Sequence, residues 1–571
     1  MRCAIAGLLI MIGFAAWCSV DLITARADLT AARGHLAAAQ AAIGNTAVVQ
    51  REVSEAGSAS ASARAALGRR PLSLVTNVPW IGAPIDSATA IASVLDDVTH
   101  SGLPQAAAAM ESLTSRPLLD RGRVDIDAIR RSQAPLAAAS GATSSALRRA
   151  KLISGRTWLP PVDRARDEFV EQLSRLDSTL SAARTATDLA PSLLGADRRR
   201  TFLVGLQNNA EARGTGGLIG GFILFSADRG KISLIRVVKD LALPPRRPID
   251  LGADYENLYG STDPTRIWQN SNQSPHFPYA ARIWRSLARQ LTGVTPDVVI
   301  GIDPPGLRSI LGATGPVALP DGRTAAADTI VATTESEAYA RFADDRDERK
   351  TYLADIAEAT FDRITSGRFQ VTALASALGA ATRDERIAVW SQAPAEQAEL
   401  AGTALGHEVP YSPGPYANVV VNNAYASKLD YYLGLTVRYR YGACTDERQQ
   451  ILIDVTLTNN VPDAVLSPEV LGTYLPGGGS LPPRTNRVTL ALYSSWSSRI
   501  KALTVDGSPV SYGEGVELGH PVHYVVLPLA PRTPTTVRFE VSEPQSTVAP
   551  DIPVQPLTNP ADVRVLGQPC S

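Results

Sequence analysis

The sequence predicts a multidomain α+β protein with an N-terminal transmembrane helix and helical stalk, an α/β layered core and a C-terminal β-sandwich. Three observations predict this: an apolar run at the start of the chain, an alanine-rich stretch behind it, and a later change to short strand-like segments. The chain of 571 residues is too long for a single core. We therefore expect four segments with the bounds 1–21, 22–190, 191–415 and 416–571.

The composition describes a globular protein. Hydrophobic residues make up 44% of the chain and charged residues 19%. The formal net charge is −1. Binding to nucleic acid requires a concentrated basic face, so this balance predicts that nucleic acid is not a partner.

The first segment is almost wholly apolar from Cys3 to Val20. A helix of this length spans about 27 Å, close to the hydrocarbon core of a bilayer. Arg2 precedes the run, which favours an inside N-terminus. We therefore expect a single-pass cell-membrane protein whose bulk is extracytoplasmic. The alternatives are a cleaved signal peptide and a lipoprotein, and Trp17 beside Cys18 disfavours both.

Residues 22–190 favour a helical stalk or bundle because alanine is abundant and is the best helix former. Pro135 is expected to break a helix or to lie at its boundary. The alanine-rich faces could pack against each other or against another protomer, so a homo-oligomer through the stalk is a further expectation.

Strands and helices alternate from Ser192 onward, and Thr201–Leu206 is one expected strand. This pattern is typical of an α/β layered domain. From about Asn418 short strands separated by turn residues predict a β-sandwich. The polar stretch from Asn422 to Tyr431 is interpreted as a domain junction, with a sugar site as the alternative.

Cys444 and Cys570 both lie in the C-terminal region. If this region is outside the cytoplasm, a disulfide between them would fix the C-terminal tail. The alternative is two unpaired thiols. No spacing of Cys and His typical of structural zinc is present.

The most informative stretch runs from Gln207 to Gly221, with the sequence QNNAEARGTGGLIGG. It places Asn208, Asn209, Glu211 and Arg213 beside several glycines, between two apolar runs. Glycines allow a backbone to come close to a partner, and polar clusters on such turns are common sites. The alternative is a tight strand–turn–strand in which these residues serve the turn alone.

This stretch, extended to QNNAEARGTGGLIGGFILFSADRGKI, resembles the signature of a bacterial family known as domain of unknown function 4012. Similar features extend from about Leu193 to Tyr432, and the segment from Asn77 to Pro84 resembles one that precedes the core in that family. The resemblance implies an architecture with a membrane anchor and helical segment. It implies no activity, because none is established for the family.

A fainter resemblance connects the core to the LytR–CpsA–Psr family of cell-wall transferases. It rests on Ala281–Val317, and on Glu337–Arg341 followed by Asp347, Arg349 and Lys350. Members of that family transfer glycopolymers from a polyprenyl-pyrophosphate carrier onto peptidoglycan. Arginines bind the pyrophosphate, and an aspartate binds magnesium.

The resemblance implies a site whose catalytic residues are Arg213, Asp240, Arg341 and Arg349. The expected ligand-binding residues are Asn208, Asn209, Glu211, Gly214, Gly216, Gly217 and Lys239. Asp240 or Glu211 would hold Mg²⁺, and the glycine amides would face a phosphate or sugar. The sequence departs from the family pattern at Thr215, where the family has its metal-binding aspartate, and at Ala343, where it has a second arginine.

Two functions follow as hypotheses. The first is an extracytoplasmic envelope protein that binds a phosphate-linked glycopolymer or a polyprenyl-phosphate precursor. An extension of this hypothesis is that the protein also transfers the bound molecule. The second is a non-enzymatic envelope scaffold or surface interaction protein. A pocket with clustered basic residues and a carboxylate would favour the first. A filled core with ion-paired arginines would favour the second.

Overall fold

The computed structural model describes residues 2–42, 45–70, 72, 82–239, 241, 247–445, 447–472 and 481–570, with side chains described from residue 20 onward. Within it the chain forms two compact units, Met1–Arg198 and Arg199–Ser571. Each unit has its own core and is described separately.

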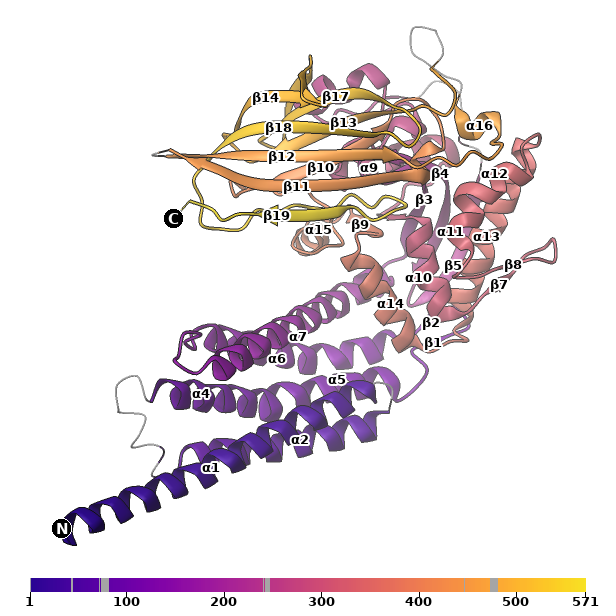
Figure 1. The fold of residues 1–571 in the computed structure, drawn as a ribbon. Coiled ribbons are helices and arrows are strands. Elements are labelled where there is room, and N and C mark those ends of the chain that lie inside the picture. The colour runs from indigo at the N-terminus through magenta and orange to yellow at the C-terminus, as the bar shows by residue number, and fades with distance from the viewer. Residues whose placement is uncertain are drawn as a thin grey trace. The chain divides into compact units, whose positions relative to one another are not determined.

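The first unit is a helical bundle with one short hairpin (Figure 1). Its helices are α1 (Arg2–Ala41), α2 (Thr46–Leu67), α4 (Ala83–Asp97), η1 (Val98–Gly102), α5 (Leu103–Thr114), α6 (Ile126–Lys151) and α7 (Pro160–Leu193), and its hairpin strands are β1 (Leu119–Asp120) and β2 (Arg123–Val124).

Small side chains fill the seams of this bundle. Ala25, Ala32, Ala56 and Ala63 are almost completely buried along α1 and α2. Alanine combines high helix propensity with a small volume, so helices that bury it can approach closely. Helix α6 continues through Pro135, contrary to the expected break. The missing amide costs one intrahelical bond, whereas the α6 face that contains Leu136 stays buried.

The predicted fold class included an N-terminal transmembrane helix, and this part of the prediction is wrong. Among the described residues, no helix is both long enough and apolar enough to cross a membrane. Helix α1 begins at Arg2, but it continues to Ala41 through charged sequence. In its described part Asp21 is buried and pairs with Arg69, so this length of α1 packs as a bundle helix.

The second unit contains an α/β sheet with the strand order β5–β4–β3–β6–β9. Strand β3 pairs antiparallel with β4 and parallel with β6, and β6 pairs antiparallel with β9. The strands are β3 (Arg200–Arg213), β4 (Gly216–Asp228), β5 (Lys231–Val238), β6 (Val298–Ile302) and β9 (Ile387–Ser391). The apolar run that predicted a strand at Thr201–Leu206 lies within β3.

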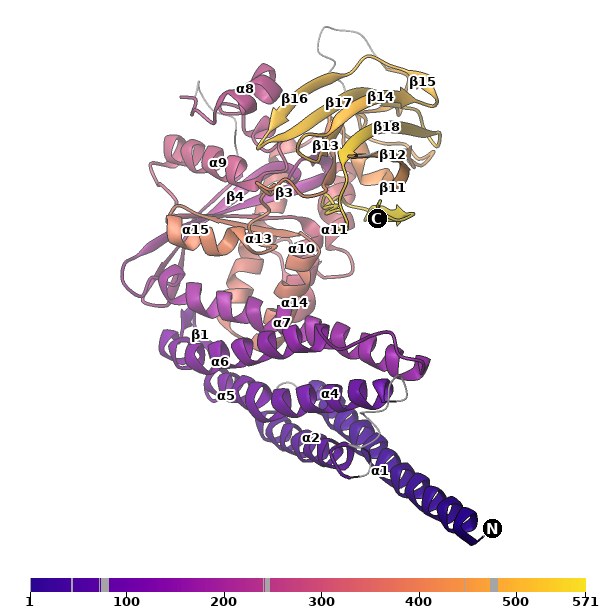
Figure 2. The same cartoon turned by 90° about the vertical axis from the view of Figure 1, so that its left-hand side faces the viewer.

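Helices and short elements connect these strands (Figure 2). The cluster that includes Phe222, Phe277, Trp284 and Val299 forms the core between sheet and helices. The connecting elements are α8 (Ala253–Tyr259), η2 (Gly260–Thr262), η3 (Trp268–Asn270), α9 (Phe277–Thr292), α10 (Pro304–Thr314), β7 (Val317–Ala318), β8 (Thr324–Ala325), α11 (Ile330–Ala332), η4 (Thr333–Glu337), α12 (Ala338–Arg341), α13 (Arg346–Ser366), α14 (Val371–Arg383) and α15 (Pro394–Ala401).

Two further sheets face each other in the C-terminal part. Their strand orders are β10–β13–β17–β16 and β15–β14–β18–β12–β11–β19. The elements are β10 (Ala417–Asn423), η5 (Leu429–Tyr432), β11 (Leu433–Cys444), β12 (Arg448–Asn459), α16 (Pro468–Leu471), β13 (Asn486–Ser494), β14 (Arg499–Val505), β15 (Ser508–Pro509), β16 (Gly513–Glu517), β17 (His520–Leu529), β18 (Pro534–Pro544) and β19 (Asp562–Leu566).

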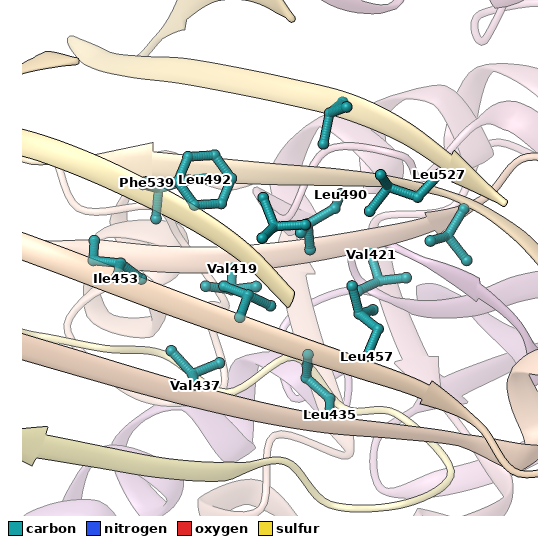
Figure 3. Close-up of a cluster of buried hydrophobic side chains, with 14 of the residues drawn as sticks. Val419, Val421, Leu435, Val437, Ile453, Leu457, Leu490, Leu492, Leu527 and Phe539 are labelled. Atoms are coloured by element: carbon teal, nitrogen blue, oxygen red, sulfur yellow. The ribbon is translucent and has the colours of Figure 1, made fainter. Parts of the chain in front are cut away.

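The core of this sandwich comes from alternate residues of each strand. Every second residue of β12 is buried, as expected for a strand with one face in a core. Val421 and Leu490 from one sheet and Leu457 and Phe539 from the other lie in the same cluster (Figure 3). Ala212 of β3 belongs to this cluster too, so one strand contributes both to the α/β sheet and to the sandwich core.

The C-terminal tail is fixed by a disulfide between Cys444 and Cys570. Before it, β19 pairs parallel with β11 at the edge of the sheet. Gln449 also receives a hydrogen bond from the amide of Cys570 at 3.1 Å. The tail thus closes one edge of the sandwich.

Candidate functional site

The stretch from Gln207 to Gly217 folds as the end of a hairpin between β3 and β4. Asn208 pairs with Leu218, and the next pairs are Ala212 with Gly217 and Arg213 with Gly216. Residues 209–211 therefore have no partner in β4. Such a bulge bends a strand and redirects its side chains, which here turn toward the C-terminal part of the unit.

Buried side chains satisfy the amides of the bulge. The amide of Asn209 donates to Oε1 of Glu335 at 3.3 Å, and that of Ala210 to Oδ1 of Asn208 at 3.0 Å. The amide of Ala212 donates to Oδ2 of Asp430 at 2.9 Å. The bulge amides therefore point at protein carboxylates and an amide oxygen.

Glu211 lies between two basic side chains. Nη2 of Arg213 is 2.9 Å from its Oε1, and Nζ of Lys428 contacts its Oε2. All three side chains are less than 10% exposed. Burial alone would raise the pKa of Glu211, but the charges of Lys428 and Arg213 outweigh it and the pKa is lowered. The carboxylate is therefore ionised and balanced by cations of the same chain.

Each nitrogen of the Arg213 guanidinium group donates to a protein oxygen. Its Nε donates to the carbonyl oxygen of Gln269 at 2.9 Å and its Nη1 to that of Ala212 at 2.8 Å. Its Nη2 donates to Glu211. An anion that bound here would have to displace these partners. The buried groups that then lost their hydrogen bonds would raise the free energy of the complex.

An aromatic ring extends the cluster. The ring of Tyr339 has the guanidinium of Arg349 4.7 Å from its centroid and the ammonium of Lys428 5.5 Å away. Nδ2 of Asn208 donates to the Tyr339 hydroxyl at 2.9 Å. Arg349 also pairs with Glu469 at 2.7 Å. The structure thus brings together four of the predicted residues, namely Asn208, Glu211, Arg213 and Arg349.

The glycines serve close packing. A Cβ on Gly217 would lie 2.2 Å from the carbonyl carbon of Asn208, and one on Gly214 would lie 2.2 Å from the carbonyl oxygen of Gln273. The amide of Gly214 donates to Oδ1 of Asn422 at 3.1 Å. Gly216 has a φ of +127°, which side-chain-bearing residues rarely adopt. Close packing thus requires glycine at positions 214 and 217, and the backbone conformation favours it at 216.

Three predicted residues are not part of this cluster as described. Lys239 is exposed and its Nζ donates to Thr351 at 2.6 Å. Arg341 is exposed, with its guanidinium 5.7 Å from the centroid of the Tyr352 ring. Asp240 lies outside the described residues.

The predicted Mg²⁺ has no suitable ligand in Glu211, because each of its oxygens contacts a basic side chain. Across the described residues, no group of three or more His, Cys, Asp and Glu side chains could hold a metal ion. The magnesium assignment therefore stays a prediction that rests on Asp240.

A second buried carboxylate group lies on the other side of Asn209. Nδ2 of Asn209 donates to Oδ2 of Asp303 at 3.0 Å, and Arg386 pairs with the same oxygen at 2.9 Å. The hydroxyl of Thr558 lies 2.6 Å from Oε2 of Glu335. Burial, with the nearby Asp303 charge, raises the pKa of Glu335 to about 8.

Sequence reasoning missed most partners of the bulge. Asp303, Glu335, Arg386 and Asp430 were not singled out, although Lys428 and Asp430 fall in the stretch interpreted as a domain junction. Of these four partners, only Asp430 lay in a stretch whose pattern drew attention, namely a polar run that precedes a strand. The contacts of that run with β3 agree with a junction.

Comparison with known proteins places part of the chain in a family. Residues 197–339 match a family model described as "Protein of unknown function (DUF4012)". The family prediction is therefore confirmed over this segment, which contains β3, β4 and Tyr339. The resemblance to the LytR–CpsA–Psr family finds no support in these comparisons.

No curated protein matches the chain. A solved structure from Legionella pneumophila, described as a "putative nutrient binding protein", matches with 7% identity and a TM-score of 0.15. The match covers 24% of this chain and 44% of that one.

Proposed function

We propose that this chain, whose residues 197–339 belong to the DUF4012 family, is a non-enzymatic, extracytoplasmic scaffold or interaction protein of the cell envelope. In this proposal the stretch 207–217, which was expected to bind a ligand, has a structural role and acts as a fastener between two parts of the unit. It joins the α/β sheet to the β-sandwich, so that both present their surfaces as one body.

The closed ion cluster carries the proposal. Glu211, Arg213 and Lys428 are buried and neutralise one another. Arg349 is directed to Glu469 and to the Tyr339 ring. A transferase that binds pyrophosphate needs donors that are aimed at the ligand before it arrives. Here each of these basic groups already has a protein partner.

The disulfide supports the extracytoplasmic location. Disulfides persist in oxidising compartments and are rare in the cytosol. Cys444 and Cys570 are bonded, and Cys570 is 8% exposed. An exported protein gains from such a bond because it fixes the C-terminal tail against unfolding.

The test is a titration of the full chain with farnesyl pyrophosphate, a short soluble polyprenyl pyrophosphate, with and without Mg²⁺. The readout is the shift in Tm, since a ligand that binds the folded state raises it. The scaffold proposal expects no saturable shift. Saturable binding that Arg213→Lys weakens and Lys239→Gln does not would overturn it, provided that both variants fold.

Calorimetry gives a second, independent readout. Since the sheet and the sandwich share Glu211, Arg213 and Lys428, residues 199–571 are expected to unfold in one transition. Two separate transitions within this unit would contradict the role of the cluster as a fastener.

A second candidate function is binding of a phosphate-linked glycopolymer at the surface near Arg341. The guanidinium groups of Arg323 and Arg341 lie 5.5 and 5.7 Å from the centroid of the Tyr352 ring, and both arginines are exposed. Tyr352 is buried, and Arg323 also pairs with Asp321 at 3.4 Å, so the contact with an anionic chain would come from the exposed guanidinium groups.

This candidate is tested with a glycerol-phosphate glycopolymer and with neutral dextran as the comparison. Binding of the anionic polymer alone, lost in Arg323→Gln with Arg341→Gln, supports it. The matched control is Arg266→Gln, an exposed arginine paired with Asp263. Equal binding by all variants, or no binding, removes this candidate.

A further inference from the structure

The connection between α6 and α7, taken with the helix ends on either side of it, is the most basic stretch of the first unit. Residues 148–166 contain six basic residues and one acidic residue, in a chain whose net charge is −1. The acidic one, Asp163, is engaged by the amide of Thr157 at 3.0 Å and by its hydroxyl at 2.8 Å. The basic residues are Arg148, Arg149, Lys151, Arg156, Arg164 and Arg166.

Some of these charges are already balanced. Arg149 pairs with Asp97 at 2.6 Å and Arg166 with Asp167 at 2.7 Å. Lys151, Arg156 and Arg164 are exposed, and within the described part of the chain they form no ion pair. Arg148 is exposed as well and donates to Oγ of Ser145 at 2.9 Å, so four of the six basic residues have no ion-pair partner among the described residues.

The same connection exposes two large apolar side chains. Leu152 is 86% exposed and Trp158 is 53% exposed. Soluble surfaces tolerate single apolar residues, but an exposed leucine and tryptophan between two basic helix ends are typical of an interaction site. Ile153, between them, is buried with Val94 and Leu173.

The backbone of the connection is held by the bundle. The carbonyl oxygen of Ile153 accepts from Nε of Arg166 at 3.1 Å, and that of Lys151 from its Nη2 at 3.3 Å. Ser87 of α4 donates to the carbonyl oxygen of Ser154 at 3.3 Å. Leu152 is thus directed outward by a fixed backbone.

Further exposed apolar residues lie at the same end of the bundle. Val20 and Ile23 of α1 are 60% and 68% exposed. They adjoin Asp21, which pairs with Arg69, and Ala25, which packs with Ile85 at the start of α4. Figures 1 and 2 both show the α6–α7 connection, the start of α4 and the outgoing part of α1 at one end of the bundle.

We propose that this end, the bundle tip formed by Val20, Ile23, Leu152, Trp158 and the exposed Lys151, Arg156 and Arg164, docks onto the surface of an anionic membrane. Anionic headgroups attract basic side chains, whereas tryptophan and leucine enter the boundary between headgroups and acyl chains. A soluble polyanion would use the charges and leave Leu152 and Trp158 without a role.

The proposal requires no membrane-spanning segment and does not rest on the scaffold function. It concerns residues 20–23 and 148–166 alone. Each basic residue removed should weaken vesicle binding about fivefold, and binding should fall as the salt concentration rises.

The experiment is co-sedimentation of the full chain with vesicles of equimolar phosphatidylcholine and phosphatidylglycerol, and with pure phosphatidylcholine vesicles. One variant carries Leu152→Ser and Trp158→Ser, and another carries Lys151→Gln, Arg156→Gln and Arg164→Gln. All variants keep the same apolar run at Cys3–Val20, so the comparison isolates the bundle tip.

Two matched controls go with these variants. Arg116→Gln, Arg130→Gln and Arg131→Gln remove the same charge from exposed positions. Arg130 and Arg131 lie near the start of α6, about 30 Å along that helix from Lys151, and pair with Asp127 and Asp125, whereas Arg116 follows α5. Tyr411→Ser removes a side chain that is 78% exposed in the second unit. An unchanged Tm establishes that each variant is folded.

The expected result is stronger binding to anionic than to neutral vesicles, weakened by both tip variants and by neither control. Binding equal to wild type in both tip variants would overturn the proposal. So would loss in the charge variant alone combined with full competition by dextran sulfate, because that pattern describes a site for soluble polyanions.

Discussion

Arg213 and Glu211, two residues apart on β3, form a buried ion pair with Nη2 2.9 Å from Oε1. The pair does not face solvent, because Arg213 is 5% exposed and Lys428 covers the other carboxylate oxygen. Charges that are buried together are stable only as a set, and removal of one partner leaves the others uncompensated.

We expect Glu211→Gln to destabilise the protein by about 3–5 kcal/mol, because it leaves Arg213 and Lys428 buried without their shared counter-charge. The measurement is denaturant unfolding of the full chain. The double variant Glu211→Gln with Lys428→Met should lose less than the sum of the two single variants, since one excess charge is gone.

The control for this cycle is Lys239→Gln. Lys239 was predicted to bind the same ligand as Arg213, but it is exposed and bonds only to Thr351 among the contacts described. Its substitution should change the free energy of unfolding by less than about 0.5 kcal/mol. A Glu211→Gln variant as stable as this control would show that the cluster does not fasten the unit.

The disulfide gives a second prediction. Loss of the bond in Cys444→Ser with Cys570→Ser should cost about 2–4 kcal/mol, because the unfolded chain regains the freedom of a long loop. A reducing agent should lower the Tm of the wild type by a similar amount and leave the variant unchanged. Hydrogen exchange should rise in β19, the edge strand next to the bond.

If alkylation under denaturing, non-reducing conditions labels Cys444 and Cys570, these two thiols are unpaired and the prediction is wrong. A variant with the stability of the wild type would mean that β19 holds by its pairing with β11 alone.

Much of the local structure followed from the apolar pattern. The run Thr201–Leu206 lies within β3, and the alternation in the C-terminal part corresponds to strands such as β12. Hydrophobic periodicity is a local signal, so it reports strands well. It also overstated one element: the apolar run at Cys3–Val20 predicted a spanning helix that is not found among the described residues.

The role of the polar stretch could not be predicted in the same way. Asn208, Glu211 and Arg213 have residue types typical of a surface site, yet the structure buries them. Their partners, Tyr339, Lys428 and Asp430, lie far along the chain. A charged side chain can be buried only when the fold brings an opposite charge next to it. The local sequence pattern does not indicate that pairing.

Glu335 makes stability depend on pH. Burial raises its pKa to about 8, well above the ordinary value of 4.5. The folded state therefore holds a proton on Glu335 that the unfolded state releases, and stability should fall as the pH rises between these two values. Above about pH 8 the whole cost is present, and below about pH 4.5 it is absent.

Glu335→Gln should remove this dependence, because the amide oxygen can still accept from Asn209 and its NH₂ can donate to Thr558. We expect the variant to be more stable than wild type by about 1–4 kcal/mol at pH 8.5, with the difference shrinking toward pH 5. Unfolding at a series of pH values measures it. A difference that stays constant with pH would contradict a titrating Glu335.

Gly217 and Gly220, both in the family motif, offer a matched pair. A Cβ on Gly217 would lie 2.2 Å from the carbonyl carbon of Asn208, whereas one on Gly220 would meet only the carbonyl oxygen of Leu206 at 3.9 Å. The first contact is with backbone and cannot be relieved by a side-chain rotation. Gly217→Ala should therefore cost more than about 3 kcal/mol or prevent folding, and Gly220→Ala should cost less than about 1 kcal/mol.

Expression level, Tm and denaturant unfolding of both variants measure this difference. A phosphate-binding loop would give another pattern, because Gly217→Ala would then spare stability and weaken a ligand. If Gly217→Ala folds with the Tm of the wild type, the bulge of β3 is not packed as described. Fastening of the sheet to the sandwich by residues 207–217 would then lose its structural basis, since Asn208 and Gly217 meet at the point where the bulge begins.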